Sequence, residues 1–157
     1  MIFILGGNGF IGSAIVRYCQ LQGIEFQAIT RQNYADFQGK SCEIFINANG
    51  NSKKYLANEQ PLAEFDASVR SVRASLEDFQ FAQYIYLSSC DVYPDCSSPV
   101  STKEEMALDV ARQSPYGFHK YLAELCVRNV AKRWLIVRMG GFVGPGLKKN
   151  PIFDILH

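Results

Sequence analysis

A glycine-rich loop close to the start of the 157-residue chain most strongly limits what this sequence can fold into. The loop GGNGFIG (6–12) lies between an apolar run, Ile2–Leu5, and a segment from 13 to 22 whose apolar residues recur at helical spacing. Glycines at GxxGxxG spacing permit a tight turn out of a strand and a close approach of the backbone to a ligand, and the N-terminus of the following helix attracts anions. This context predicts a site for the pyrophosphate of a dinucleotide, with an ordinary glycine turn as the alternative. The residues assigned to the site are Gly6, Gly9, Phe10, Ile11 and Gly12.

Short apolar runs alternate with helical segments along the rest of the chain, which predicts an α/β fold with a parallel sheet. After the first run, strands are expected at 25–30, 43–47, 84–87 and 134–138, and long helices at about 61–81 and 115–132. About a dozen residues separate the second and third strands, fewer than a full helical crossover needs. We therefore expect a Rossmann-like, doubly wound parallel sheet with a shortened segment after the second strand.

The composition excludes several other classes of protein. Lys and Arg number 16 against 15 Asp and Glu, and this net charge of +1 gives no positive excess for binding nucleic acid or an anionic membrane. The five cysteines form no CxxC pair and only two histidines accompany them, so neither a disulfide framework nor a metal site is expected. No apolar run has the length of a membrane span, and no basic segment precedes the first run as in a signal peptide. We expect one cytoplasmic domain over residues 1–157.

The residue types at the end of the second expected strand bear on which dinucleotide is bound. NAD-specific folds commonly place a carboxylate there for the 2′-hydroxyl of the adenosine ribose. This chain instead has Arg31, whose guanidinium suits a 2′-phosphate through its charge and its paired hydrogen bonds. The sequence therefore favours NADP(H), with NAD(H) as the second choice. The alternative for Arg31 is a solvated surface arginine.

Tyr116 and Lys120 stand four residues apart in the last long helical segment, which places them on one face of that helix. A neighbouring ammonium group favours the phenolate, so we expect a lowered pKa for Tyr116 and proton exchange with a substrate hydroxyl or carbonyl. Lys120 is also suited to hydrogen-bond the ribose of a nicotinamide nucleotide. Ser89 follows the fourth strand, at the edge where ligands bind in open α/β sheets. The alternative for the Tyr–Lys motif is an ordinary surface pair.

With these pieces in this order, the sequence resembles the extended short-chain dehydrogenase/reductase family, the group of NAD(P)-dependent sugar epimerases and dehydratases. The segments that carry the resemblance span nearly the whole chain: GGNGFIG (6–12), INANG (46–50), YLSSCDVYPD (86–95), SPYGFHKYLAE (114–124) and LIVRMGGFVGPG (135–146). The resemblance implies a catalytic triad in which Tyr116 is the acid/base, Ser89 orients the substrate and Lys120 lowers the pKa of the tyrosine. It also implies that the residues passing alongside the cofactor are Asn47, Ala48 and Asn49.

Two departures from the family pattern bear on the reaction. Ser68 stands in the central helix where the family often has an asparagine. Cys90 and Asp91 follow Ser89 where sugar-nucleotide dehydratases tend to carry an Asp-Glu pair, which weakens the dehydratase interpretation and leaves Asp91 as an additional acid. Cys90 is interpreted as a small filler instead of a nucleophile. The shortened segment after Arg31 is closer to the trimmed reductases related to the epimerases.

The resemblance implies hydride transfer between NAD(P) and a nucleotide-sugar-like substrate, by an oxidoreductase or an epimerase. Little sequence follows GPG (144–146), so the family's substrate-binding portion is expected to be largely absent. Lys148 and Lys149 are candidate contacts for substrate phosphates, or part of a solvated loop. Apolar side chains lacking that portion would lie exposed or meet a partner chain, and homodimers are common among relatives. The alternative function is a non-catalytic NADP(H)-binding sensor or scaffold.

Overall fold

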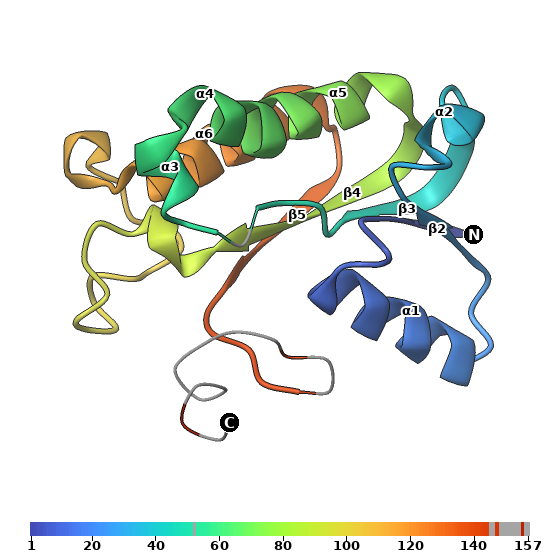
Figure 1. Ribbon diagram of the computed structural model, residues 1–157, viewed down its shortest axis with the longest axis horizontal. Coiled ribbons are helices and arrows are strands. Elements are labelled where there is room, and N and C mark those ends of the chain that lie inside the picture. The colour runs from blue at the N-terminus through green and yellow to red at the C-terminus, as the bar shows by residue number, and fades with distance from the viewer. Residues whose placement is uncertain (52, 145–146, 148–154, 156–157) are drawn as a thin grey trace.

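A computed structural model describes residues 1–51, 53–144, 147 and 155, and a five-stranded parallel sheet forms its centre (Figure 1). The strands follow the order β2-β1-β3-β4-β5. Their bounds are β1 Ile2–Leu5, β2 Phe26–Ile29, β3 Ser41–Asn47, β4 Gln80–Ser89 and β5 Trp134–Met139. The predicted Rossmann-like α/β fold is confirmed, and because the strands are parallel their carboxyl ends share one edge of the sheet.

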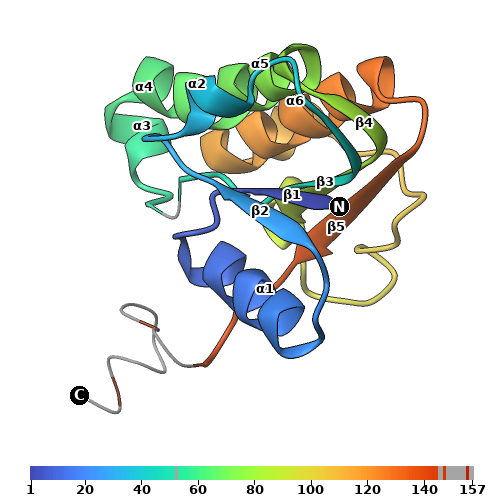
Figure 2. The same cartoon turned by 90° about the vertical axis from the view of Figure 1, so that its right-hand side faces the viewer.

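Helices cover both faces of the sheet, as a doubly wound fold requires (Figure 2). The helix α1 (Phe10–Leu21) lies on one face. The other α-helices of the described chain lie on the opposite face. They are α2 (Tyr34–Phe37), α3 (Leu56–Glu59), α4 (Pro61–Phe65), α5 (Ser71–Asp78) and α6 (Pro115–Val130).

The connection from β2 to β3 is short, as predicted. It contains the single-turn helix α2, and β2 is an edge strand that pairs with β1, while β3 pairs with the other side of β1. Asn33 closes the turn after β2, since its side chain accepts the N–H of Thr30 at 2.7 Å and donates to the carbonyl of Ala28 at 3.1 Å. The chain therefore reaches β3 without an outer strand and its long crossover helix.

The long helix expected over 61–81 is shorter and less regular in the structure. It ends at Asp78, because Phe79 is extended and β4 already begins at Gln80. The extended backbone buries the Phe79 ring against Phe45, with centroids 4.9 Å apart, and this burial outweighs the helical period of the sequence. A π-helical turn, Asp66–Arg70, also separates α4 from α5.

The main core lies between the sheet and the helices α5 and α6. Phe45 and Tyr84 are fully buried, and their rings stack with centroids 5.2 Å apart. The strand β5 is covered less well, since the side chains of Trp134, Leu135 and Val137 are exposed.

Candidate active site

The loop after β1 folds as its glycine spacing requires. Gly6 has a φ of +82°, which side chains rarely tolerate, and its carbonyl accepts the N–H of Gly9 at 2.8 Å. A Cβ on Gly12 would lie 2.1 Å from the Gly6 carbonyl oxygen, so glycine is needed for α1 to start this close to the strand. No side chain caps the N-terminus of α1, so its first N–H groups stay available to an anion.

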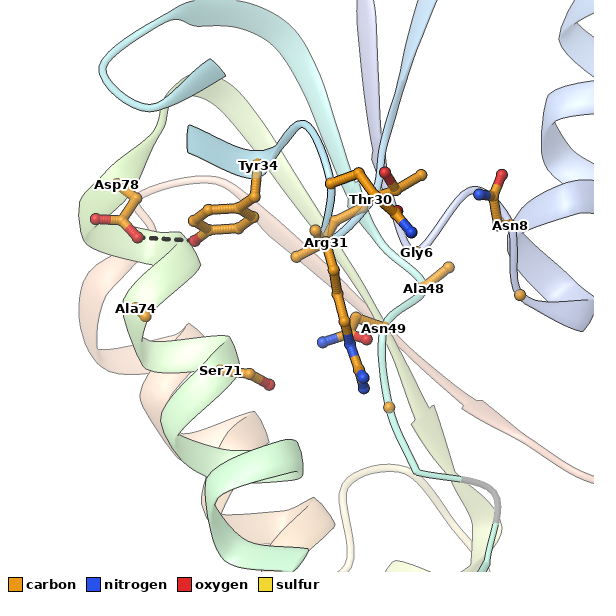
Figure 3. A pocket seen from close by; sticks show the side chains of 14 residues that line it. Gly6, Asn8, Thr30, Arg31, Tyr34, Ala48, Asn49, Ser71, Ala74 and Asp78 are labelled. Carbon is orange, nitrogen blue, oxygen red and sulfur yellow. Dashed lines mark hydrogen bonds between the residues drawn. The ribbon is translucent and has the colours of Figure 1, made fainter. Parts of the chain in front are cut away.

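A pocket of about 700 Å³ lies beside this loop, at the carboxyl ends of β1, β2 and β3 (Figure 3). Arg31 follows β2, and its side chain extends into the pocket. The loop residues Gly6 and Gly9 line the same pocket, as do Ala48 and Asn49 after β3. Folding therefore brings these five candidate cofactor-binding residues together.

Residues that the sequence did not single out also line this pocket. Ser71 and Ala74 are small side chains on α5, and the Tyr34 hydroxyl donates to Asp78 Oδ2 at 2.8 Å (Figure 3). Burial, and then the Asp78 carboxylate, raise the pKa of Tyr34 above its usual range, so the phenol stays a neutral donor. The sequence carries no signal for this pair, because the contact exists only once α2 folds back over the end of α5.

A second pocket, of about 490 Å³, adjoins the first because residues 48–50 line both. Ser89 at the end of β4 and Tyr116 and Lys120 on α6 line this second pocket, together with Phe10 and Ile11 of α1. The three residues of the expected triad therefore share one cavity, next to the start of α1.

The position of Tyr116 follows from how α6 begins. Ser114 is the N-cap and its hydroxyl accepts the N–H of Gly117 at 3.0 Å, while Pro115 occupies the first helical position. A Cβ on Gly117 would lie 2.0 Å from the carbonyl oxygen of Asp91. Glycine at 117 thus lets the first turn of α6 lie directly against the turn that follows β4, which brings Tyr116 to the end of that strand.

The hydroxyl of Tyr116 donates to the backbone carbonyl of Asn51 at 3.1 Å. The expected lowering of its pKa is wrong for the chain as it stands: burial, and then the nearby carboxylate of Asp91, raise the pKa of Tyr116 above its usual range. The ammonium groups of Lys120 and Lys54 each lie 5.9 Å from the centre of the Tyr116 ring. At that distance they do not offset the desolvation of the phenol.

Lys120 is a buried cation, with 4% of its surface exposed. Its Nζ donates to the hydroxyl of Tyr86 at 3.4 Å. Burial lowers the pKa of Lys120 to about 8, against the opposing influence of nearby carboxylates, of which Glu64 is the strongest. Gly50 leaves room for this ammonium group, since a Cβ there would lie 2.9 Å from the Nζ.

The hydroxyl of Ser89 donates to Asp91 Oδ2 at 2.6 Å, and Asp91 forms a salt bridge with Lys54 at 2.6 Å. Asp91 was expected beside the serine as an additional acid, whereas Lys54 comes from a loop that shows no motif. Cys90 also lines this pocket. A hydroxyl, a carboxylate and an ammonium group thus lie together beside Tyr116.

Asn47 lines neither pocket, although it precedes residues that line both. It is fully buried, its amide donates to Tyr84 Oη at 2.7 Å, and its Oδ1 accepts the N–H of Asn49 at 2.9 Å. Strand alternation directs this side chain into the core. Asn47 therefore shapes the turn that carries Ala48 and Asn49 to the cavity.

The two lysines Lys148 and Lys149 lie outside the described residues. Within the described part of the chain, no group of three or more His, Cys, Asp or Glu side chains is placed to hold a metal ion. No helix among those residues is long and apolar enough to cross a membrane.

Comparisons with known proteins establish the family and the fold. A sequence model of the NAD dependent epimerase/dehydratase family matches residues 2–154. A dTDP-4-dehydrorhamnose reductase from Clostridium acetobutylicum ATCC 824 has a similar structure, with a TM-score of 0.79 and 19% identity over 99% of this chain and 57% of its own. A dTDP-4-dehydrorhamnose reductase from Bacillus anthracis str. Ames, in complex with NADP, has a TM-score of 0.80 and 16% identity, over 99% of this chain and 58% of its own. A UDP-galactose 4-epimerase has a TM-score of 0.77 and 23% identity, over 99% of this chain and 61% of its own.

The chain spans 57% to 61% of the length of these three structural relatives. No curated protein matches the sequence. At these identities the structural likeness establishes the fold, while the match to the family model rests on the sequence itself.

Proposed function

The chain belongs to the NAD-dependent epimerase/dehydratase family, and we propose that it binds NADP(H) and transfers hydride between the nicotinamide and a nucleotide-sugar-like substrate. The reaction is an oxidoreduction or an epimerisation, and residues 1–157 act as the NAD(P)-binding domain. The observation that carries the proposal is the convergence of Ser89, Tyr116 and Lys120 on a cavity that adjoins the glycine loop.

The residues present fit a nicotinamide dinucleotide. The glycine loop and the uncapped start of α1 suit the pyrophosphate, and a side chain at Gly12 would push the start of α1 away from the loop. The pocket that contains Arg31 suits the adenosine half, and the cavity around Tyr116 suits the nicotinamide half. Arg31 supports NADP over NAD, because a guanidinium matches the charge and geometry of a 2′-phosphate. A structural relative also holds NADP.

Arg31 gives the cofactor assignment its test. In fluorescence titrations, NADPH should bind more tightly than NADH, and Arg31→Ala should weaken NADPH binding about 10-fold or more, the effect of losing a charged hydrogen bond. Binding of NADH should not change. Arg70→Ala, an exposed arginine paired with Asp66, is the control and should leave both curves unaltered. Equal binding curves for NADPH and NADH would refute the proposed contact of Arg31 with the 2′-phosphate.

The proposed roles of the three residues follow from their environments. A bound nicotinamide supplies or accepts the hydride. Tyr116 is a protonated phenol at neutral pH, which suits a group that donates its proton to a carbonyl oxygen. The Lys120 cation stabilises the phenolate that this transfer leaves. Ser89, once its hydroxyl leaves Asp91, hydrogen-bonds the same substrate oxygen.

Tyr116→Phe tests the catalytic assignment. With a nucleotide-linked 4-keto sugar as substrate, NADPH consumption should fall about 100-fold or more, the usual contribution of a general acid. NADPH affinity should stay within about twofold, and Tyr121→Phe on the same helix should leave the rate unchanged. An unaltered rate in Tyr116→Phe would refute this mechanism. Tight NADPH binding without turnover of any nucleotide sugar would instead support the non-catalytic binding module.

A further inference from the structure

A buried polar cluster lies beside the Tyr116–Lys120 pair, and its members line neither of the two pockets. Glu64 on α4 is 1% exposed, and its carboxylate accepts a hydrogen bond from the Ser68 hydroxyl and contacts Nδ1 of His119. The Phe65 ring packs edge-on against the His119 imidazole, with ring centroids 5.5 Å apart. The cluster therefore joins α4, the π-helical turn and α6, which lie side by side above the sheet (Figures 1 and 2).

Burying a carboxylate is costly unless partners compensate for its lost hydration. His119 immediately precedes Lys120, so the contact with Glu64 is made one residue away from the buried ammonium group. Glu64 is also the strongest of the carboxylate influences on Lys120. The buried carboxylate of Glu64 lies next to the expected catalytic lysine, which suggests that it acts on the charge of that lysine.

Several titratable groups face Lys120 from the elements packed around it. Two of the carboxylates are already neutralised by permanent cations: Glu124 pairs with Arg138 at 2.8 Å, and Asp91 pairs with Lys54 at 2.6 Å. Glu64 has no Lys or Arg partner among the described residues, and it contacts there the imidazole of His119, which is a cation only when it is protonated. Of the three carboxylates, Glu64 is therefore the one whose negative charge is least neutralised by other cations. The groups facing Lys120 are Glu64 from α4, Tyr86 from β4, Asp91 from the turn after β4, and Tyr116 and Glu124 from α6.

We propose that Glu64 is a positioning residue: its carboxylate, held by Ser68 and His119, is the counter-charge that keeps the Lys120 ammonium group protonated beside Tyr116. The consequence for catalysis rests on the proposed function, whereas the charge relation is a property of the free chain. Burial already lowers the pKa of Lys120 to about 8, so a further decrease would bring it close to physiological pH. Without Glu64 a large fraction of Lys120 would be neutral at physiological pH.

The test is a pH titration of Lys120 followed by NMR, in the full chain labelled with ¹³C at the lysine ε-carbons. The Lys120 signal is assigned by its loss in Lys120→Arg. In Glu64→Gln the midpoint of the Lys120 titration should move down by about one pH unit, the usual effect of removing one nearby opposite charge. Glu77→Gln, which removes an exposed carboxylate paired with Arg73, is the control and should leave the midpoint unchanged.

Two further variants separate charge from packing. Ser68→Ala removes a hydrogen bond to Glu64 but keeps its charge, and should move the midpoint much less than Glu64→Gln. The double variant Glu64→Gln/His119→Gln replaces both ionisable groups by amides that can bond to each other, and should show the same downward shift. Unchanged midpoints in the folded Glu64 variants would overturn the proposal. So would a failure of both Glu64 variants to fold while Ser68→Ala folds, because Glu64 would then be a packing requirement.

The same variants keep this proposal distinct from the proposed function. If the chain neither binds NADPH nor turns over a nucleotide sugar, the proposed function fails, and the titration still decides the role of Glu64. If turnover is measured, the alkaline limb of the kcat profile should move down by the same pH unit in Glu64→Gln, with KM unchanged. A purely structural role would lower activity without moving that limb.

Discussion

At the scale of single residues, spacing singled out candidate catalytic side chains but gave no information on their electrostatic environment. The four-residue interval between Tyr116 and Lys120 places them on one helical face, and both line the same cavity. Spacing carries no information on desolvation, however, and burial determines that the pKa of Tyr116 rises while that of Lys120 falls. Asn47 shows the same limit, because strand alternation turns its side chain away from the cavity that its neighbours line.

The buried cation of Lys120 should reduce the stability of the fold. Its pKa is about 8 in the folded chain, against an ordinary value of 10.5, so the folded state binds this proton less tightly than the unfolded state. The penalty is fully present below pH 8 and disappears as the pH rises to 10.5. Lys120→Met should therefore raise the free energy of unfolding at pH 7 by about 2–3 kcal/mol while abolishing turnover.

Urea denaturation of the chain and of Lys120→Met, repeated between pH 7 and pH 10.5, checks this prediction. The difference in unfolding free energy should shrink toward zero across that range. Lys103→Met, at an exposed position, should change stability little at any pH. A Lys120→Met variant that is less stable than the parent at pH 7 would show that the ammonium group is better compensated than its burial indicates.

At the scale of elements, short apolar runs identified the strands, and helical periodicity failed where tertiary packing competed with it. The period across 61–81 is helical, yet burial of Phe79 ends the helix at Asp78. Contacts between distant elements leave no mark in a single sequence, and the Tyr34–Asp78 and Glu64–His119 pairs are of this kind. The start of α6 was predictable, because Ser114 and Pro115 form a standard N-terminus.

One buried ion pair fixes β5 against α6 and the end of β4. Glu124 is fully buried; its carboxylate accepts from Arg138 Nη2 at 2.8 Å and from the Ser88 hydroxyl at 2.7 Å. Arg138→Leu removes the nearer of the two cations that pair with this carboxylate and leaves Arg128 at 3.9 Å, and it should lower the free energy of unfolding by about 3 kcal/mol or more. The same change should weaken the pairing of β5 with β4, the strand that ends in Ser89.

Arg73→Leu provides the matched comparison, since Arg73 pairs with Glu77 at 2.7 Å on the exposed face of α5. Loss of that surface pair should cost less than about 1 kcal/mol in the same denaturation experiment. If the two variants lose similar amounts of stability, the buried pair does not hold these elements together.

At the scale of the whole molecule, the strand order explains why the two pockets lie next to each other. The connection from β1 leads to β2 on one side, and β3 lies on the other side of β1, so the chain reverses direction across the sheet between β1 and β3. Ligands of open α/β folds bind at such a point. The loops meet there, since a Cβ on Gly6 would lie 3.0 Å from the backbone of Ala48. From this crevice the second cavity continues to β4 and α6, where Ser89 and Tyr116 lie.

We propose that NADPH binds in this crevice and that its hydride passes to a sugar carbon beside Tyr116. The most direct test incubates the chain with NADPH deuterated at nicotinamide C4 and a set of nucleotide-linked 4-keto sugars, and measures the mass of the products. We predict a reduced nucleotide sugar that carries one deuterium, formed by the parent chain and lost in Tyr116→Phe. Bound NADPH with no deuterium in any sugar product, and no epimerised sugar when nucleotide hexoses are supplied, would contradict the account.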